Sequence, residues 1–132
     1  MLNVLENAVF EDKQALIVED DAHNLLALSS LLGNMKIHYK RNTTGANVLQ
    51  QARRLRPDFI LLDMDLPDGD SFAIYEKLRD DQDLKNTPVI AIADGQIINH
   101  LLPRIRAGGF AAYIAKPIPP RDFEALLRGV LH

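Results

Sequence analysis

Residues 59–69 read FILLDMDLPDG and carry the strongest structural signal in the chain. The first four of these residues are apolar on both faces, which is typical of a strand buried inside a parallel sheet. The strand ends in an acid, Asp63, and Leu66–Gly69 then consists of turn-forming residues. A buried strand that stops at a carboxylate predicts a polar site at its carboxyl end.

Four more strands are expected, two before this one and two after it, and each is followed by a helical pattern. They are expected at residues 15–18, 37–39, 89–93 and 112–115, of which the second is more polar. In the last helical pattern, Phe123 and four aliphatic residues recur at i, i+3, i+4, i+7 and i+8. Strands that alternate with helices predict the α/β class, with a doubly wound parallel sheet covered on both faces.

The helical pattern after residues 89–93 contains a proline that limits where the helix can run. Pro103 would cost about 3 kcal/mol in a helix interior but is tolerated in a first turn. Either the helix begins near Asn99, after a long loop, or it kinks at Pro103. Its large aliphatic residues are Ile97, Ile98, Leu101, Leu102 and Ile105. They exceed one buried stripe, which favours either a partner or dimer surface or a more deeply covered helix.

Length and composition exclude several classes of protein. The 132 residues suit one domain, expected at residues 13–132 behind an N-terminal arm at residues 1–12. A formal net charge of −3 argues against direct nucleic-acid binding. The absence of cysteine excludes disulfides, thiolate catalysis and cysteine–zinc sites. Without a membrane-length apolar run or a signal-peptide pattern, a cytoplasmic protein with no membrane partner is expected.

Polar residues follow three of the expected strands. Glu19, Asp20 and Asp21 follow the first, Asp63 ends the third, and Lys116 ends the fifth. If these strand ends converge, a hard cation such as Mg²⁺ relieves the repulsion between the carboxylates. Asp63 can then act as a nucleophile toward a phosphoryl group whose charge Lys116 neutralises. The alternatives are structural: Asp20 or Asp21 caps a helix, Asp63 caps a turn, and Lys116 is an ordinary surface lysine.

Four segments resemble the receiver domains of response regulators in bacterial two-component systems. They are ALIVEDD at residues 15–21, DFILLDMDLPDG at 58–69, TPVIAIAD at 87–94 and AGGFAAYIAKPI at 107–118. The last is most similar to stand-alone receivers and to those attached to hybrid histidine kinases. The resemblance implies a flavodoxin-like fold of five βα units, with the strands in the order 2-1-3-4-5.

The resemblance also implies how the site works. Asp63 would accept a phosphoryl group from a phosphohistidine on a histidine kinase or a histidine phosphotransfer protein, so the chain would be a signalling receiver rather than an enzyme. The Mg²⁺ ligands would be Glu19, Asp20, Asp63 and the backbone carbonyl of Asp65. Lys116 would pair with the phosphoryl oxygens.

Signal output is also implied by the resemblance. Tyr113 would be the aromatic switch residue, and the peptide bond before Pro117 would be cis. The downstream protein partner would bind through the fourth helix and the fifth strand, and a homodimer is one option. A half-buried strand aromatic is the structural alternative for Tyr113.

Two residues depart from the family pattern. Ala93 and Asp94 stand where the family has Ser or Thr followed by a small residue. The missing hydroxyl would normally bond a phosphoryl oxygen and couple phosphorylation to Tyr113. Asp94 adds a carboxylate that either repels the phosphate or joins the hydration shell of the metal.

Two rival interpretations follow from the same residues. One is a pseudo-receiver or adaptor, in which Ala93 and Asp94 have uncoupled the switch. The other is a phosphatase of the haloacid dehalogenase type, because LLDMD at residues 61–65 resembles its DxD motif. That family has the motif on its first strand and follows it with other residues, which counts against it here.

Overall fold

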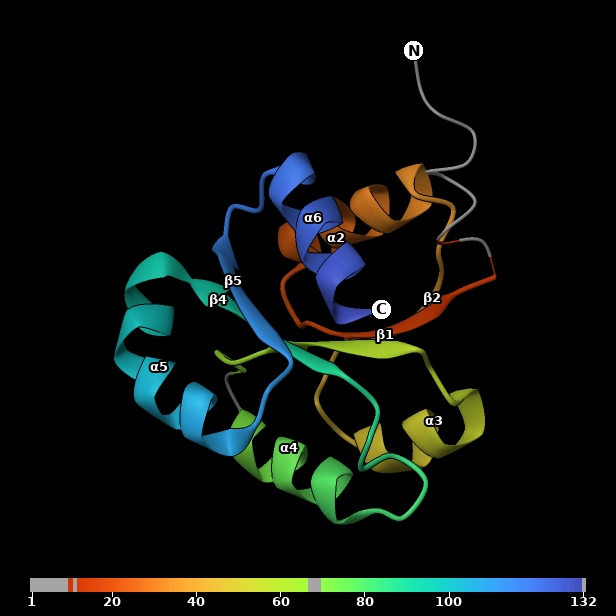
Figure 1. Cartoon of the computed structure of the whole chain (residues 1–132), viewed down its shortest axis with the longest axis vertical. Coiled ribbons are helices and arrows are strands. Elements are labelled where there is room, and N and C mark those ends of the chain that lie inside the picture. The colour runs from red at the N-terminus through yellow and green to blue at the C-terminus, as the bar shows by residue number, and fades with distance from the viewer. Residues whose placement is uncertain (1–9, 11, 67–69, 132) are drawn as a thin grey trace.

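A computed structural model describes residues 10, 12–66 and 70–131 of the chain. Its strands are β1 (Gln14–Val18), β2 (His38–Asn42), β3 (Phe59–Asp63), β4 (Val89–Asp94) and β5 (Ala112–Lys116). Its helices are α2 (Ala22–Asn34), α3 (Val48–Leu55), α4 (Ser71–Asp80), α5 (Gly95–Gly108) and α6 (Pro120–Val130). The five strands form one parallel sheet in the order β2-β1-β3-β4-β5, which confirms the predicted fold class and strand order (Figure 1).

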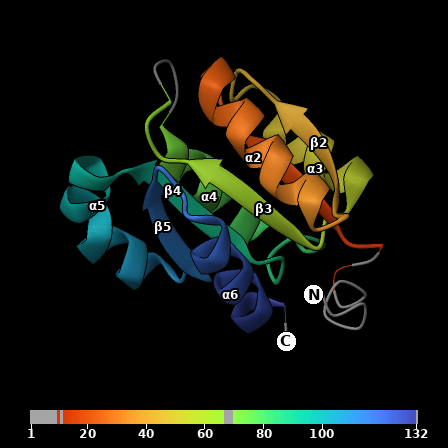
Figure 2. The same cartoon turned by 90° about the horizontal axis from the view of Figure 1, so that it is seen from above.

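Helices cover both faces of the sheet. In Figures 1 and 2, α2 and α6 lie on one face, and α3, α4 and α5 lie on the other. The alternation of side chains along β3 explains the two layers, because Phe59 and Leu61 join the core on one face while Ile60 and Leu62 join the core on the other. All four side chains are fully buried, as the two-sided apolar pattern predicts.

The second strand lies further along the chain than predicted. The expected strand at residues 37–39 is observed at His38–Asn42, and Ile37 is a core residue just before it. Lys40 and Arg41 are exposed because β2 is an edge strand that pairs only with β1. Hydrophobic patterning does not report a polar edge strand, which explains the error.

Helix α5 begins directly after β4, so of the two alternatives raised by Pro103, the start near Asn99 after a long loop is wrong. The helix can begin there because Asp94 caps it. The Asp94 carboxylate accepts a hydrogen bond from the backbone N–H of Gln96 at 2.9 Å. Pro103 lies inside the helix. Of the five large aliphatic residues, Ile98 and Ile105 are buried and the other three are half-buried.

The predicted N-terminal arm and the turn after β3 are only partly described. Phe10 is buried in the core beneath α2 and α6, and its carbonyl accepts a hydrogen bond from the Lys13 N–H at 3.2 Å. Residues 1–9 and 11, and the turn residues 67–69, lie outside the described residues. The boundary between arm and domain therefore stays a prediction. Within the described part of the chain, no helix has the length and apolar character needed to cross a membrane.

Candidate functional site

Three carboxylates gather at the carboxyl ends of β1 and β3. The two strands are neighbours and pair Val18 with Leu62, so the next residues, Glu19 and Asp63, lie side by side. Oxygen atoms of Glu19, Asp20 and Asp63 all lie within 4.8 Å of one another. Glu19 and Asp63 are buried and Asp20 is exposed. Parallel pairing therefore produces the predicted cluster.

Lys116 supplies the positive charge of the site from the far side of β4. Its Nζ lies 3.0 Å from Glu19 Oε1 and 3.5 Å from Asp63 Oδ1. The lysine side chain is only 15% exposed. The interpretation of Lys116 as an ordinary surface lysine is therefore wrong. The Lys116–Pro117 peptide bond is cis, which is the isomer that the resemblance implied.

The site holds more negative than positive charge. Burial, followed by the neighbouring Asp63 carboxyl, raises the pKa of Glu19 to about 7 against the opposing effect of Lys116. Burial lowers the pKa of Lys116, but its hydrogen bond to Glu19 and the charges of Asp63 and Glu19 raise it overall above its ordinary value. The lysine is therefore charged, and a cation that neutralised the carboxylates would be favourable. Three oxygen ligands of this kind suit a hard divalent cation such as Mg²⁺.

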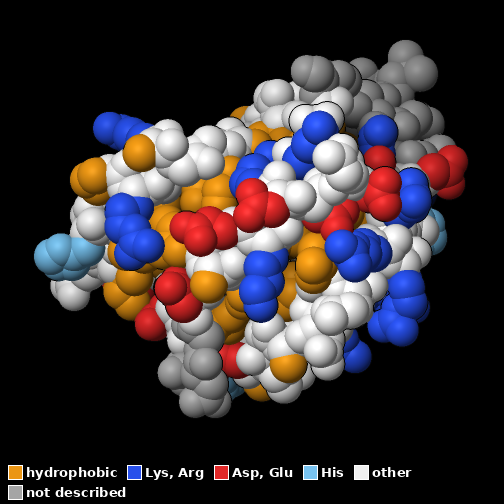
Figure 3. All heavy atoms as spheres, turned by 90° about the horizontal axis from the view of Figure 1, so that it is seen from below, with side chains coloured by type: hydrophobic (Ala, Val, Ile, Leu, Met, Phe, Trp, Pro, Cys, Tyr) orange, Lys and Arg blue, Asp and Glu red, His pale blue; other side chains and the backbone are white. Residues whose placement is uncertain are grey.

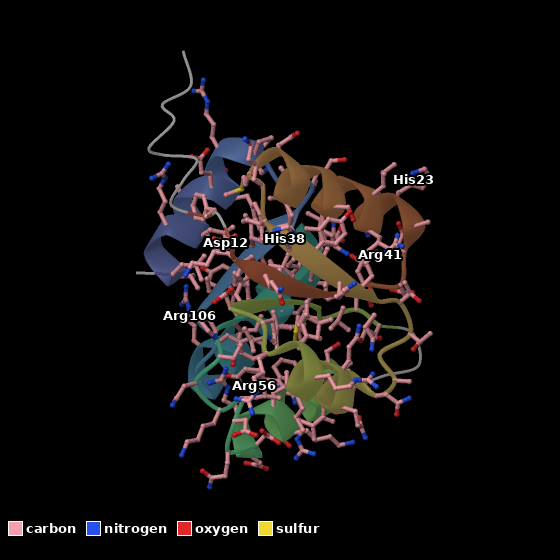
Figure 4. All side chains as sticks on the ribbon, turned by 90° about the vertical axis from the view of Figure 1, so that its right-hand side faces the viewer. Asp12, His23, His38, Arg41, Arg56 and Arg106 are labelled. Carbon is pink, nitrogen blue, oxygen red and sulfur yellow. The ribbon has the colours of Figure 1, made fainter. Side chains whose placement is uncertain are left out.

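Local hydrogen bonds separate the acids that serve the site from those that cap helices. The Asp21 carboxylate accepts the Asn24 N–H at 3.0 Å and caps α2, which leaves Asp20 free to face the cluster. Among the residues that the structure describes, histidine adds nothing to the cluster. His23 lies on the first turn of α2 and His38 lies on β2 (Figure 4).

Two hydrogen bonds hold Asp63 in place. The Asp65 N–H donates to Asp63 Oδ1 at 3.0 Å, and the hydroxyl of Ser71 donates to the backbone carbonyl of Asp63 at 2.6 Å. Ser71 is the first residue of α4, but it is not the residue that caps this helix. Asp70 takes that role by accepting the Phe72 N–H at 3.0 Å. A serine next to a capping aspartate carries no sequence signal for this support of β3.

The site opens into a cavity of about 330 Å³. Its lining residues are Asn24, Asp65, Asp94, Lys116 and Pro117. A groove of about 320 Å³ adjoins it between α2 and the start of α6, and Asn24, Lys116 and Pro117 line both. The sequence did not single out Asn24, because its place on the cavity wall depends on where the fold puts the start of α2 relative to Lys116 and Pro117.

The predicted switch residues lie around β4 and β5. Ala93 is fully buried and pairs with Ala115, so no hydroxyl is present at this position. Tyr113 is 38% exposed, and its hydroxyl accepts a long hydrogen bond of 3.4 Å from Arg106, which lies on α5 (Figure 4). This partial exposure fits both the switch residue and a half-buried strand aromatic.

Comparisons with known proteins agree with this geometry. Residues 15–128 match the family model of the response regulator receiver domain. The polar-differentiation response regulator DivK of Brucella anthropi is 36% identical over 115 residues, which cover 86% of this chain and 93% of DivK. The N-terminal domain of the nisin resistance regulator NsrR superposes with a TM-score of 0.80 at 25% identity, covering 92% of this chain and 100% of that chain. The chemotaxis response regulator CheY4 of Vibrio cholerae superposes with a TM-score of 0.80 at 22% identity, covering 90% and 98%.

Proposed function

Because the chain belongs to the response regulator receiver family and is thus a receiver domain of two-component signalling, we propose that it signals by accepting a phosphoryl group on Asp63. One observation carries this proposal. Three carboxylates lie within 4.8 Å of one another, and the Lys116 ammonium lies 3.5 Å from Asp63 Oδ1. The family match supports a receiver rather than a phosphatase of the haloacid dehalogenase type.

The proposed chemistry is a single phosphoryl transfer. A carboxylate oxygen of Asp63 attacks the phosphorus of a phosphohistidine, so an O–P bond forms while the P–N bond breaks and the imidazole takes up a proton from water. Lys116 then faces the oxygens of the transferred group and neutralises part of their charge. Glu19, Asp20, Asp63 and the backbone carbonyl of Asp65 would hold Mg²⁺, which supplies the remaining positive charge when bound.

The proposed partners use different surfaces. The groove beside α2 suits a histidine kinase or phosphotransfer protein, because it shares Asn24 and Lys116 with the site cavity. The downstream protein, or a second copy of the chain, is placed on α5 and β5. Figure 3 shows the face that α3, α4 and α5 cover, where hydrophobic atoms lie between charged side chains. Phosphohistidine donors are made from ATP, which supports a cytoplasmic location.

The direct test is phosphoryl uptake by the wild-type chain. Incubation with Mg²⁺ and acetyl phosphate should add the mass of one phosphoryl group, and hydroxylamine should remove it because acyl phosphates are labile. Intact-mass spectrometry measures both. The absence of an adduct with acetyl phosphate and with a panel of phosphorylated histidine kinases would contradict the proposal.

The adaptor remains a second candidate because of Ala93. This side chain is fully buried next to β5 and offers no hydrogen bond to a phosphoryl oxygen. A chain that binds Mg²⁺ and its downstream partner but never takes up phosphate would be this adaptor. The same mass measurement therefore separates the two candidates.

Restoring a hydroxyl at residue 93 should strengthen the response of Tyr113 to phosphorylation. Serine is preferred to threonine, because Ala93 has no exposed surface and serine adds a hydroxyl without the extra methyl group. In Ala93→Ser, phosphorylation should shift the ¹⁹F NMR line of 3-fluorotyrosine at residue 113 more than in the wild type. Ala91→Ser is the matched control, since Ala91 is equally buried two residues earlier on β4. Equal shifts in all three proteins would contradict this prediction.

Mg²⁺ binding should weaken as the pH falls below about 7. The pKa of Glu19 is raised from 4.5 to about 7, and protons compete with the cation for this carboxylate. The Mg²⁺ dissociation constant should therefore be about tenfold higher at pH 6 than at pH 8. The raised pKa of Glu19 also affects the stability of the fold. Because this pKa lies above its ordinary value, the metal-free protein loses stability as the pH rises toward 7. Bound Mg²⁺ should offset this loss.

Calorimetry at the two pH values measures the affinity, with thermal unfolding as a second readout. Glu19→Gln is the control, because an amide does not titrate and should remove most of the pH dependence. Equal Mg²⁺ affinities of the wild type at pH 6 and pH 8 would contradict the prediction.

A further inference from the structure

We infer that Asp94 relays phosphorylation of Asp63 to α5 by electrostatic repulsion, in place of the hydroxyl that Ala93 lacks. This inference rests on the proposed function, because it needs a phosphoryl group on Asp63. It assigns to Asp94 a regulatory role that is distinct from holding the metal. Two contacts, one toward the site and one toward the helix, carry the argument.

Toward the site, Asp94 shares the cavity with the phosphorylation machinery. It is the last residue of β4 and pairs in register with Lys116 on β5. Asp94, Asp65 and Lys116 all line the same cavity of about 330 Å³. A phosphoryl group on Asp63 would enter the space that these side chains surround.

Toward the helix, Asp94 is the N-cap of α5. Its Oδ1 accepts the Gln96 N–H at 2.9 Å, which satisfies one of the free N–H groups in the first turn. The same carboxylate therefore borders the cavity and holds the start of the helix that follows β4. A change in the position of the Asp94 carboxylate therefore changes both the cavity wall and the cap of α5.

Phosphorylation alters the charge that Asp94 faces. Conversion of the Asp63 carboxylate to an acyl phosphate adds about one negative charge and extends the oxygens outward into the cavity. Lys116 and Mg²⁺, when bound, compensate part of this charge, but Lys116 is already shared with Glu19 at 3.0 Å and the cation with the carboxylates that would hold it. The Asp94 carboxylate is exposed, so repulsion can turn it toward water and away from the Gln96 N–H. The first turn of α5 then loses its cap.

The other end of α5 is fixed, so the response is confined to its beginning. The hydroxyl of Tyr75 on α4 donates to the carbonyl of Gly108 at 2.8 Å. The ring of Tyr75 stacks on Phe110 with centroids 3.7 Å apart. Pro103 lacks an N–H, so the hydrogen-bond ladder between the two ends of the helix is interrupted. These contacts leave the first turns of α5 as the segment that the cap controls.

Amide hydrogen exchange tests the relay. The N–H groups of residues 99–101 report on the first turn, because in a helix they donate to carbonyls four residues earlier. Phosphorylation of the wild type with acetyl phosphate and Mg²⁺ should speed their exchange about fivefold, as expected for loss of one cap. Exchange at residues 105–108 should stay unchanged. Intact mass of the same sample gives the phosphorylated fraction.

Asp94→Asn is the decisive variant, because an amide oxygen still caps the helix but carries no charge. Its exchange at residues 99–101 should change less than twofold on phosphorylation. Asp70→Asn is the matched control: Asp70 caps α4 through the same i to i+2 hydrogen bond but does not line the cavity, so its response should equal that of the wild type.

The outcomes separate the relay from the proposed function. An Asp94→Asn variant that is phosphorylated and still shows the fivefold change would overturn the relay alone. So would a phosphorylated wild type without any change at residues 99–101. A wild type that takes up no phosphoryl group would overturn the proposed function, and the relay with it.

Discussion

Replacing Asp63 with asparagine is expected to abolish phosphoryl uptake. The amide has no anionic oxygen that can attack phosphorus, whereas the Asp63 carboxylate has one, lies 3.5 Å from the Lys116 ammonium and is held by the Asp65 N–H. Intact-mass spectrometry after incubation with acetyl phosphate and Mg²⁺ should show no adduct on Asp63→Asn under conditions that modify the wild type.

The fold should survive this substitution, so loss of uptake reports on chemistry. Asparagine has the shape of aspartate and keeps the oxygen that accepts the Asp65 N–H. It also removes one of two neighbouring buried carboxylates, so the thermal midpoint should be equal or higher. Asp65→Asn is the matched control and should still take up phosphate. Persistent uptake by Asp63→Asn would place the acceptor elsewhere.

Replacing Lys116 with methionine is expected to produce the largest loss of stability among the site variants. Glu19 and Asp63 are 0% and 3% exposed and would lose their counter-charge. Breaking a buried ion pair from one side should cost about 3 kcal/mol in the free energy of unfolding at pH 8 without Mg²⁺. Methionine keeps the apolar stem of the lysine, so lost packing contributes little.

Two conditions should reduce this loss and so identify its electrostatic cause. At pH 6 the loss should be smaller, because the pKa of Glu19 is about 7 even beside Lys116 and the carboxyl takes up a proton when unpaired. Addition of Mg²⁺ at pH 8 should also recover part of it. Urea unfolding measures the loss at pH 8, at pH 6 and at pH 8 with Mg²⁺. Exposed Lys77 is the control position. A Lys116→Met variant as stable as Lys77→Met at pH 8 would contradict the prediction.

These two variants address different parts of the site. Asp63→Asn removes the nucleophile while the ion pair between Lys116 and Glu19 remains. Lys116→Met leaves the nucleophile but exposes the repulsion that the lysine relieves. If both variants behave as expected, the acceptor and its counter-charge are established independently, and the roles of Ala93 and Asp94 can be examined in a site of known chemistry.

Much of the fold was predictable because its signals are local. The apolar runs around Phe59–Leu62 and Val89–Ala93 identified strands buried on both faces, and alternation with helices predicted a parallel sheet. Acids at the ends of those runs predicted where polar groups would gather, since parallel strands bring their carboxyl ends to one edge. The polar β2 was misplaced, because this edge strand lacks the apolar run that the other strands have.

The choice among chemically equivalent side chains was left to tertiary structure. Sequence could not decide whether Asp20 or Asp21 caps α2, and it did not indicate that Asp94 caps α5. Those choices depend on which backbone N–H groups point at each carboxylate once the strand ends are in place.

By itself, the sequence determined the α/β architecture and the set of acids and lysine available to a site, because periodicity and strand ends are short-range properties. Only the tertiary structure decided which of them meet. Lys116 and Glu19 are 97 residues apart in the chain and 3.0 Å apart in the fold. Ser71 likewise reaches the carbonyl of Asp63 only because α4 packs back against β3. Such contacts follow from the packing of whole elements, which no local pattern contains.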